Sequence, residues 1–164
     1  MEAACRIEDV ASVVLYEPVS RPFADSAIEH VADLVDAGDL DRAVARILTE
    51  VGGTPQEQVV AMRNLPAWAY LRPLAVPAAT ELAALNRHEP DFARFAAALI
   101  PTTILVGEKS LDREPYGAAA NRFIRALPSV RTQILPGQGH LAHVEAATQL
   151  ADAVSEILRS DGAS

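Results

Sequence analysis

Three short apolar runs, set far apart in the chain, restrict the fold more than any other feature. They cover residues 10–16 (VASVVLY), 102–107 (TTILVG) and 130–135 (VRTQIL). Each run is too short for a buried helix and is bounded by proline, glycine or polar residues, which favours strands. Amphipathic stretches at 116–127 and 145–158 follow the second and third runs. Alternating strands and helices predict an α/β fold in which parallel strands are joined by right-handed crossovers.

Between the first and second runs the strand pattern disappears. Residues 40–51, for example, carry apolar side chains at helical spacing and are closed by two glycines. Pro66, Pro73 and Pro77 are expected to break the later part of this block into short helical pieces. The predicted division is 1–21 with 100–164 for the strand-bearing core and 22–99 for a helical insertion.

Composition excludes several classes of protein. The net charge of −8 and the scattered basic residues argue against nucleic acid or an anionic membrane as partner. The single cysteine, Cys5, permits no internal disulfide, which fits a reducing cytoplasm. The chain has no apolar run near the ~20 residues of a membrane span, no metal-ligand cluster and no phosphate-binding loop. We therefore expect a cytoplasmic protein without a cofactor.

Two residues sit where strands are expected to end. His140 lies on a glycine-rich turn (LPGQGH) between the third strand and the last helix, a position suited to holding an imidazole over a pocket. Glu17 follows the first strand directly, where it is either a site carboxylate or a solvated loop residue. His143 lies three residues beyond His140, and a structural or surface role is favoured for it.

Two aromatic residues stand out within the helical insertion. Trp68 and Tyr70 lie close together among its prolines. Such residues usually pack in a core, but aromatic side chains also line ligand pockets. Both are therefore kept as substrate-binding candidates.

Four segments, taken in order, share a family pattern. They are 13–18 (VVLYEP), 101–107 (PTTILVG), 127–136 (LPSVRTQILP) and 137–145 (GQGHLAHVE). They resemble the sixth strand, the seventh strand, the eighth strand and the catalytic-histidine loop of cap-containing α/β-hydrolases. The resemblance implies a partial sheet of three parallel strands, with a helical cap inserted between the first and the second.

The resemblance also implies roles for the site residues. His140 matches the general base, which takes a proton from the nucleophile or from an attacking water. The family usually places the acid after the seventh strand, where this chain has Ser110, and Asp112 lies two residues further on. A variant of the family places the acid after the sixth strand, where Glu17 lies. Glu17 is favoured and Asp112 stays open.

The family's G-x-S-x-G nucleophile motif is absent from the sequence. One interpretation is a truncated hydrolase of esters or related small molecules, inactive alone because the nucleophile and the oxyanion hole are missing. The alternative is a non-catalytic α/β module, or a pseudo-enzyme that binds a partner. An unrelated all-helical binding protein is a third, weaker interpretation.

The first strand has a further consequence. In the family the sixth strand lies next to the fifth, which has no counterpart in this sequence. Residues 10–16 are therefore expected to leave an open apolar edge, and such an edge favours self-association or leaves the fold only marginally stable.

Overall fold

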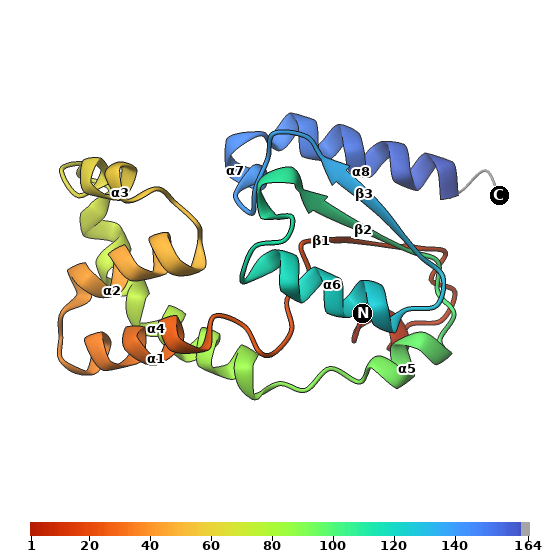
Figure 1. Cartoon of the computed structure of the whole chain (residues 1–164), viewed down its shortest axis with the longest axis horizontal. Coiled ribbons are helices and arrows are strands. Elements are labelled where there is room, and N and C mark those ends of the chain that lie inside the picture. The colour runs from red at the N-terminus through yellow and green to blue at the C-terminus, as the bar shows by residue number, and fades with distance from the viewer. Residues whose placement is uncertain (162–164) are drawn as a thin grey trace. The chain divides into compact units, whose positions relative to one another are not determined.

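A parallel sheet of three strands is the centre of one of the chain's two compact units. The computed structural model describes residues 1–161. The sheet unit comprises Met1–Ser20 and Glu89–Ser164, and the helical unit comprises Arg21–His88. The sheet has the order β1 (Val13–Tyr16), β2 (Thr102–Gly107), β3 (Val130–Leu135), as Figure 1 shows. Both pairings are parallel, so the predicted α/β class with three parallel strands is confirmed.

Helices cover the two faces of this sheet in the way that strand alternation requires. All six residues of β2 are buried. Ile104 and Val106 belong to a core cluster with residues of α5 (Phe92–Ala97) and α6 (Tyr116–Ala126). Leu105 points to the other face and packs with Leu135, against the side of α8 (Ala147–Asp161). The unit is thus a sheet between two helical layers (Figure 1).

The extent of the helical insertion differs from the prediction. The sequence places residues 89–99 in the insertion, but α5 lies in the sheet unit. The reason is aromatic packing: the ring of Phe92 lies 5.1 Å from that of Phe123, and Phe95 stacks on Phe123 at 6.4 Å. This packing removes large apolar rings from water in the core of the sheet unit.

The helical unit is built around its own core. Its elements are α1 (Asp25–Asp36), α2 (Leu40–Arg46), the π-helix η2 (Ile47–Val51), α3 (Gln56–Met62) and α4 (Trp68–Arg87). The buried residues of this core are Ala43, Val44, Val59, Trp68 and Ala75. The two ends of the unit are tied together, because the Asn86 amide both accepts from Phe23 N–H at 3.0 Å and donates to Phe23 C=O at 2.9 Å.

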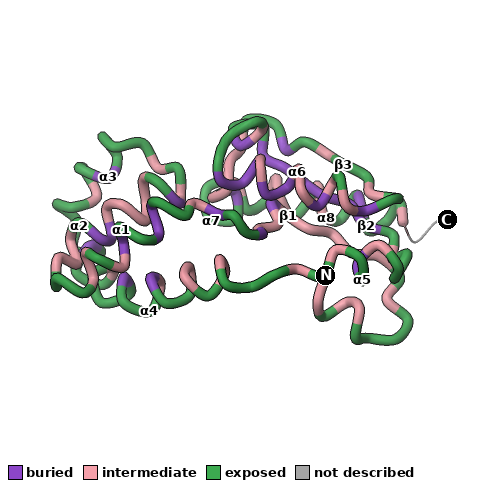
Figure 2. The backbone as a smooth tube through the Cα atoms, turned by 60° about the horizontal axis from the view of Figure 1, so that its bottom comes forward, coloured by how far each residue is buried: buried purple, intermediate pink, exposed green. Residues whose placement is uncertain are grey.

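The prediction that prolines divide this region holds at Pro66, which lies between α3 and α4, but was wrong for the other two prolines. Pro73 and Pro77 both lie inside the continuous helix α4. They are four residues apart, so they share one face, and both are exposed. Figure 2 shows exposed stretches along α4. The carbonyl groups that lose their N–H partners therefore face water, which satisfies them and lets the helix continue.

The remaining elements are short. They are the 3-10 turns η1 (Ala4–Arg6) and η3 (Glu108–Ser110) and the helix α7 (Ala142–Glu145). The predicted amphipathic stretch at 145–158 is the single helix α8, and α7 precedes it across Ala146, whose φ of −145° is not helical. No helix among residues 1–161 is both long and apolar enough to cross a bilayer.

The first strand is shorter than predicted and only half-buried. It spans Val13–Tyr16 instead of 10–16. It pairs with β2 on one side, and among residues 1–161 no strand pairs with its other side. The half-burial follows from this edge position.

The aromatic cluster of the sheet unit makes a prediction for stability. Replacing Phe123 by Ala should lower the free energy of unfolding by about 3–5 kcal/mol, because it removes a buried ring and leaves a cavity. Denaturant unfolding followed by circular dichroism measures this change. Ile134→Ala is the matched control, since this side chain is 47% exposed, and an equal loss in both variants would contradict the assignment of this core.

The free edge of β1 makes a second prediction, which concerns self-association. Val13 N–H donates to Pro101 O, and Glu17 N–H donates to Leu105 O. The alternation of a parallel strand therefore turns Val14 N–H toward the open edge. We expect copies of the chain to associate through this edge, and Val14→Pro to shift the population toward monomer.

Sedimentation velocity over a range of concentrations measures this association. Ile134→Ala serves again as the control, because it lies on β3, which β2 separates from the free edge of β1. A wild-type chain that stays monomeric throughout would contradict the expectation.

Candidate active site

The carboxyl ends of the three strands bring together the polar groups of the candidate site. Glu17 follows β1 directly, Gly107 is the last residue of β2, and His140 lies on the turn after β3. Because the strands are parallel, their carboxyl ends lie at the same end of the sheet. This end is where α/β folds usually bind ligands.

The Glu17 carboxylate is the most buried polar group of this site. The residue is 2% exposed. One carboxylate oxygen accepts from Gly107 N–H at 2.9 Å, and the other lies 3.2 Å from His140 Nδ1. The backbone φ of Glu17 is +43°, in the left-handed region that residues other than glycine rarely adopt. A backbone held in this region turns the side chain back toward β2, and such strain is common at functional sites.

Gly107 is required by this arrangement. A Cβ atom at this position would lie 2.7 Å from the carbonyl oxygen of Gln138 and 2.9 Å from the Glu17 carboxylate. Both distances are too short for a carbon atom. Glycine therefore lets the end of β2, the histidine turn and the acid come together.

The histidine turn is anchored on three sides. Lys109 N–H donates to Gln138 O at 2.8 Å, and Gly137 N–H donates to the Glu108 carboxylate at 2.6 Å. The Tyr16 hydroxyl donates to Gly139 O. These contacts fix the backbone that carries His140.

The His140 imidazole is held at one nitrogen and on one face. Its side chain is 29% exposed, and Nδ1 faces the Glu17 carboxylate. Among residues 1–161, Nε2 has no hydrogen-bond partner. The ring of Tyr116 stacks on the imidazole with centroids 3.6 Å apart and planes 10° apart. With a proton on Nδ1 donated to Glu17, Nε2 has a free lone pair and can act as a general base.

The two tyrosines near this imidazole are held neutral. Burial raises the pKa of the Tyr116 phenol above its usual range, and the negative charge of Glu17 adds to this effect. Burial likewise raises the pKa of Tyr16, with further contributions from Glu17 and Glu145. Neither phenol is therefore a source of a phenolate near neutral pH.

The other residues considered for the catalytic group lie apart from this contact. Asp112 is exposed, with a φ of +57°, and among the described residues it makes no hydrogen bond or ion pair with His140. His143 is exposed, and its Nδ1 lies 3.3 Å from the His140 carbonyl oxygen. Of the two acid candidates, the structure brings only Glu17 to the imidazole.

The two substrate-binding candidates lie in the helical unit and differ in exposure. Trp68 is 6% exposed, packs in the core of the unit, and donates from its indole N–H to Asp41 at 2.7 Å. Tyr70 is 77% exposed. Only Tyr70 therefore offers an aromatic surface to a ligand.

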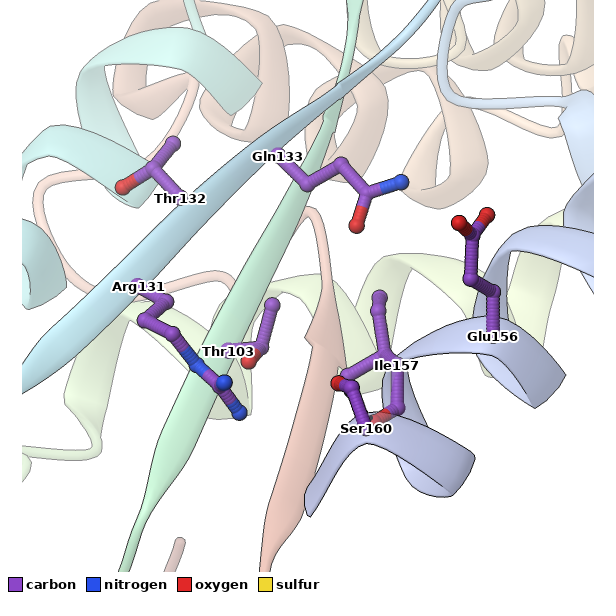
Figure 3. Close-up of a pocket in the computed structure, with 7 residues that line it drawn as sticks. All are labelled: Thr103, Arg131, Thr132, Gln133, Glu156, Ile157 and Ser160. Atoms are coloured by element: carbon purple, nitrogen blue, oxygen red, sulfur yellow. Dashed lines mark hydrogen bonds between the residues drawn. The ribbon is translucent and has the colours of Figure 1, made fainter. Parts of the chain in front are cut away.

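A cavity of about 270 Å³ lies elsewhere in the sheet unit (Figure 3). Thr103 and Arg131 pair near the amino-terminal ends of β2 and β3, and they line the cavity with Ile157 of α8. Since Glu17 and His140 lie at the opposite ends of the strands, this cavity is separate from the candidate site. Among residues 1–161, no group of three or more His, Cys, Asp or Glu residues is placed to hold a metal ion.

Sequence reasoning missed three contributors to this site: Tyr16, Gly107 and Tyr116. The sequence marks Gly107 only as the end of a strand. Tyr16 immediately precedes Glu17, and Tyr116 opens a helix after Pro115 and before a glycine. That proline–tyrosine–glycine sequence was the available signal for Tyr116, but it does not reveal the imidazole as the tyrosine's partner.

Comparisons with known proteins agree with this architecture. No protein-family model and no curated protein sequence matches the chain. Solved structures do match: an alpha/beta hydrolase from Sphaerobacter thermophilus (24% identity, TM-score 0.55, 85% of this chain), NosK from Streptomyces actuosus (22%, 0.52, 98%) and proline iminopeptidase from Mycobacterium smegmatis (20%, 0.53, 98%). At these identities the likeness shows the fold, which is a partial α/β-hydrolase fold.

The coverage of those structures is also informative. The chain spans 56%, 64% and 60% of their respective lengths. Each matched protein is therefore longer than this chain, and any activity in its name belongs to that longer protein.

The raised tyrosine pKa values predict a loss of stability in alkali. Above the usual phenol pKa of about 10, the unfolded chain loses these protons while the folded chain keeps them. The unfolded state then binds fewer protons, so the free energy of unfolding falls as pH rises. Urea unfolding at several pH values on either side of about 10 measures this slope.

The control for that slope is a set of tyrosine variants. The double variant Tyr16→Phe/Tyr116→Phe should show a shallower fall, whereas Tyr70→Phe, which changes an exposed ring, should match the wild type. Equal slopes in all three proteins would contradict the prediction.

Proposed function

We propose that the sheet unit carries the acid–base part of a hydrolytic active site of the α/β-hydrolase type. His140 is the general base and Glu17 is its carboxylate partner. The observation that carries this proposal is the 3.2 Å contact between Glu17 and His140 Nδ1, at the carboxyl ends of three parallel strands. The partial α/β-hydrolase fold supports it.

The chemistry follows from the two ring nitrogens of His140. Nε2 takes the proton of a nucleophilic hydroxyl, or of a water that attacks a covalent intermediate. The resulting imidazolium is stabilised by Glu17, whose other oxygen is held by Gly107 N–H. Nε2 then returns the proton to the leaving group. The substrate class is an ester or a related small molecule with an electrophilic carbon.

The nucleophile must come from outside the 164 residues of this sequence. The chain contains no G-x-S-x-G motif, and the oxyanion hole of such enzymes depends on the residue after that nucleophile. A longer polypeptide or a second chain would supply both groups. The 164 residues alone should therefore have no substantial hydrolase activity.

The helical unit is proposed as the cap of this site. It is inserted between β1 and β2 and has a core of its own. A separate core is what we expect of an element that controls access to a site. Tyr70, with its exposed ring, is the candidate substrate contact. The role of Trp68 in this proposal is to stabilise the cap from within.

A non-catalytic module is the second candidate function. The observation that favours it is again the missing nucleophile motif. In such a module the contact between Glu17 and His140 would serve stability only. The Glu17–His140 contact and the expected lack of hydrolase activity are therefore tested in separate experiments.

The proposed pair predicts a single tautomer for His140. Long-range ¹H–¹⁵N NMR should show the neutral ring with its proton on Nδ1, donated to Glu17. Glu17→Gln should change this tautomer ratio, while Asp112→Asn, which alters an exposed carboxylate, should leave it unchanged. A wild-type ring protonated at Nε2 would contradict the pairing. In an assembled enzyme, Glu17→Gln should lower kcat by about 10⁴-fold.

The absence of turnover is tested with the purified chain. With activated aryl esters, its rate should not exceed that of free imidazole at the same concentration, and His140→Ala should not change it. Turnover that disappears in His140→Ala would show that the chain alone is catalytic.

A further inference from the structure

We infer that Tyr116 is a positioning residue for His140, whose ring holds the plane of the imidazole so that Nδ1 stays on Glu17 and Nε2 faces the reacting group. This inference rests on the proposed role of His140. Tyr116 stacks on the imidazole and has no proton-transfer role of its own in the proposed chemistry, so it acts through the base.

The geometry of the two rings carries the inference. Their centroids are 3.6 Å apart and their planes differ by 10°, so they lie face to face. The hydrogen bond to Glu17 holds the imidazole at one point in its plane. A single point still permits the ring to swing about that bond. The ring of Tyr116 blocks this motion from one side, so the two contacts together determine the direction of Nε2.

The chain holds Tyr116 rigidly enough for this task. Tyr116 is the first residue of α6 and is 8% exposed. The next residue, Gly117, approaches the backbone so closely that a Cβ atom there would lie 2.2 Å from Ser110 O. Gly117 N–H also donates to Arg113 O at 2.9 Å. The start of α6 therefore packs directly on the loop after β2, and this close packing presents the tyrosine ring to the imidazole.

The electronic character of the ring suits the reaction. Because the pKa of Tyr116 is raised, its phenol is neutral at the pH at which a histidine base works. A neutral aromatic face attracts a cation. When His140 takes a proton, the imidazolium therefore finds a favourable face above its plane as well as the Glu17 carboxylate in its plane.

Two substitutions separate positioning from simple packing. Tyr116→Phe keeps the ring and removes the hydroxyl, whereas Tyr116→Leu keeps an apolar side chain and removes the ring. Positioning by the ring predicts that phenylalanine preserves the state of His140 and that leucine does not. A role in packing alone predicts that the state of His140 stays the same in both folded variants.

NMR of the isolated chain provides the measurement, with no need for turnover. In the wild type and in Tyr116→Phe, the carbon-bound protons of the His140 ring should be shifted upfield by the stacked aromatic ring. In Tyr116→Leu this shift should vanish, and the ratio of the Nδ1–H to the Nε2–H tautomer should fall about two- to tenfold, the range expected for one aromatic pair.

The outcomes separate this inference from the proposed function. A wild-type His140 without the upfield shift overturns the stacking, and this holds even if the leucine variant fails to fold. A tautomer ratio unchanged in folded Tyr116→Leu, or lost equally in Tyr116→Phe, overturns positioning by the ring. An upfield-shifted imidazole with its proton on Nε2 overturns the pairing with Glu17 and leaves the stacking intact.

Discussion

The buried carboxylate of Glu17 connects the three strand ends on which the candidate site depends. It follows β1, accepts a hydrogen bond from the last residue of β2, and lies against the histidine presented after β3. A carboxylate with so little exposure is stable only when its oxygens have partners. These contacts join Glu17 to Gly107, 90 residues further along the chain, and to His140, 123 residues further along.

The surroundings of that carboxylate share one physical requirement, close backbone approach. Gly107 permits the acid and the histidine turn to meet at the end of β2, and Gly117 permits α6 to pack on the preceding loop. Neither glycine takes part in chemistry. Each removes a side chain that would otherwise separate Glu17, His140 and Tyr116, so the geometry of the site depends on two positions that have no functional groups.

The division into units gives the proposed chemistry its context. The sheet unit contains Glu17 and His140, the proposed acid–base pair, and the helical unit has a separate core. The matched solved structures are larger, and this chain spans 56–64% of their lengths. In the proposed function, the base, the acid and the positioning ring come from this chain, and the nucleophile, whose motif the sequence lacks, comes from elsewhere.

The sequence by itself determined the α/β class, the three strands, and Glu17 and His140 as candidates, because strand runs and glycine turns are local patterns. It did not decide between Glu17 and Asp112, since that choice depends on a distance between residues 123 positions apart. Only the tertiary structure showed that α4 is continuous. Its two inner prolines are exposed, so solvent can satisfy the carbonyl groups that they leave without a donor. The stacking of Tyr116 on His140 likewise arises only when α6 packs beside the histidine turn.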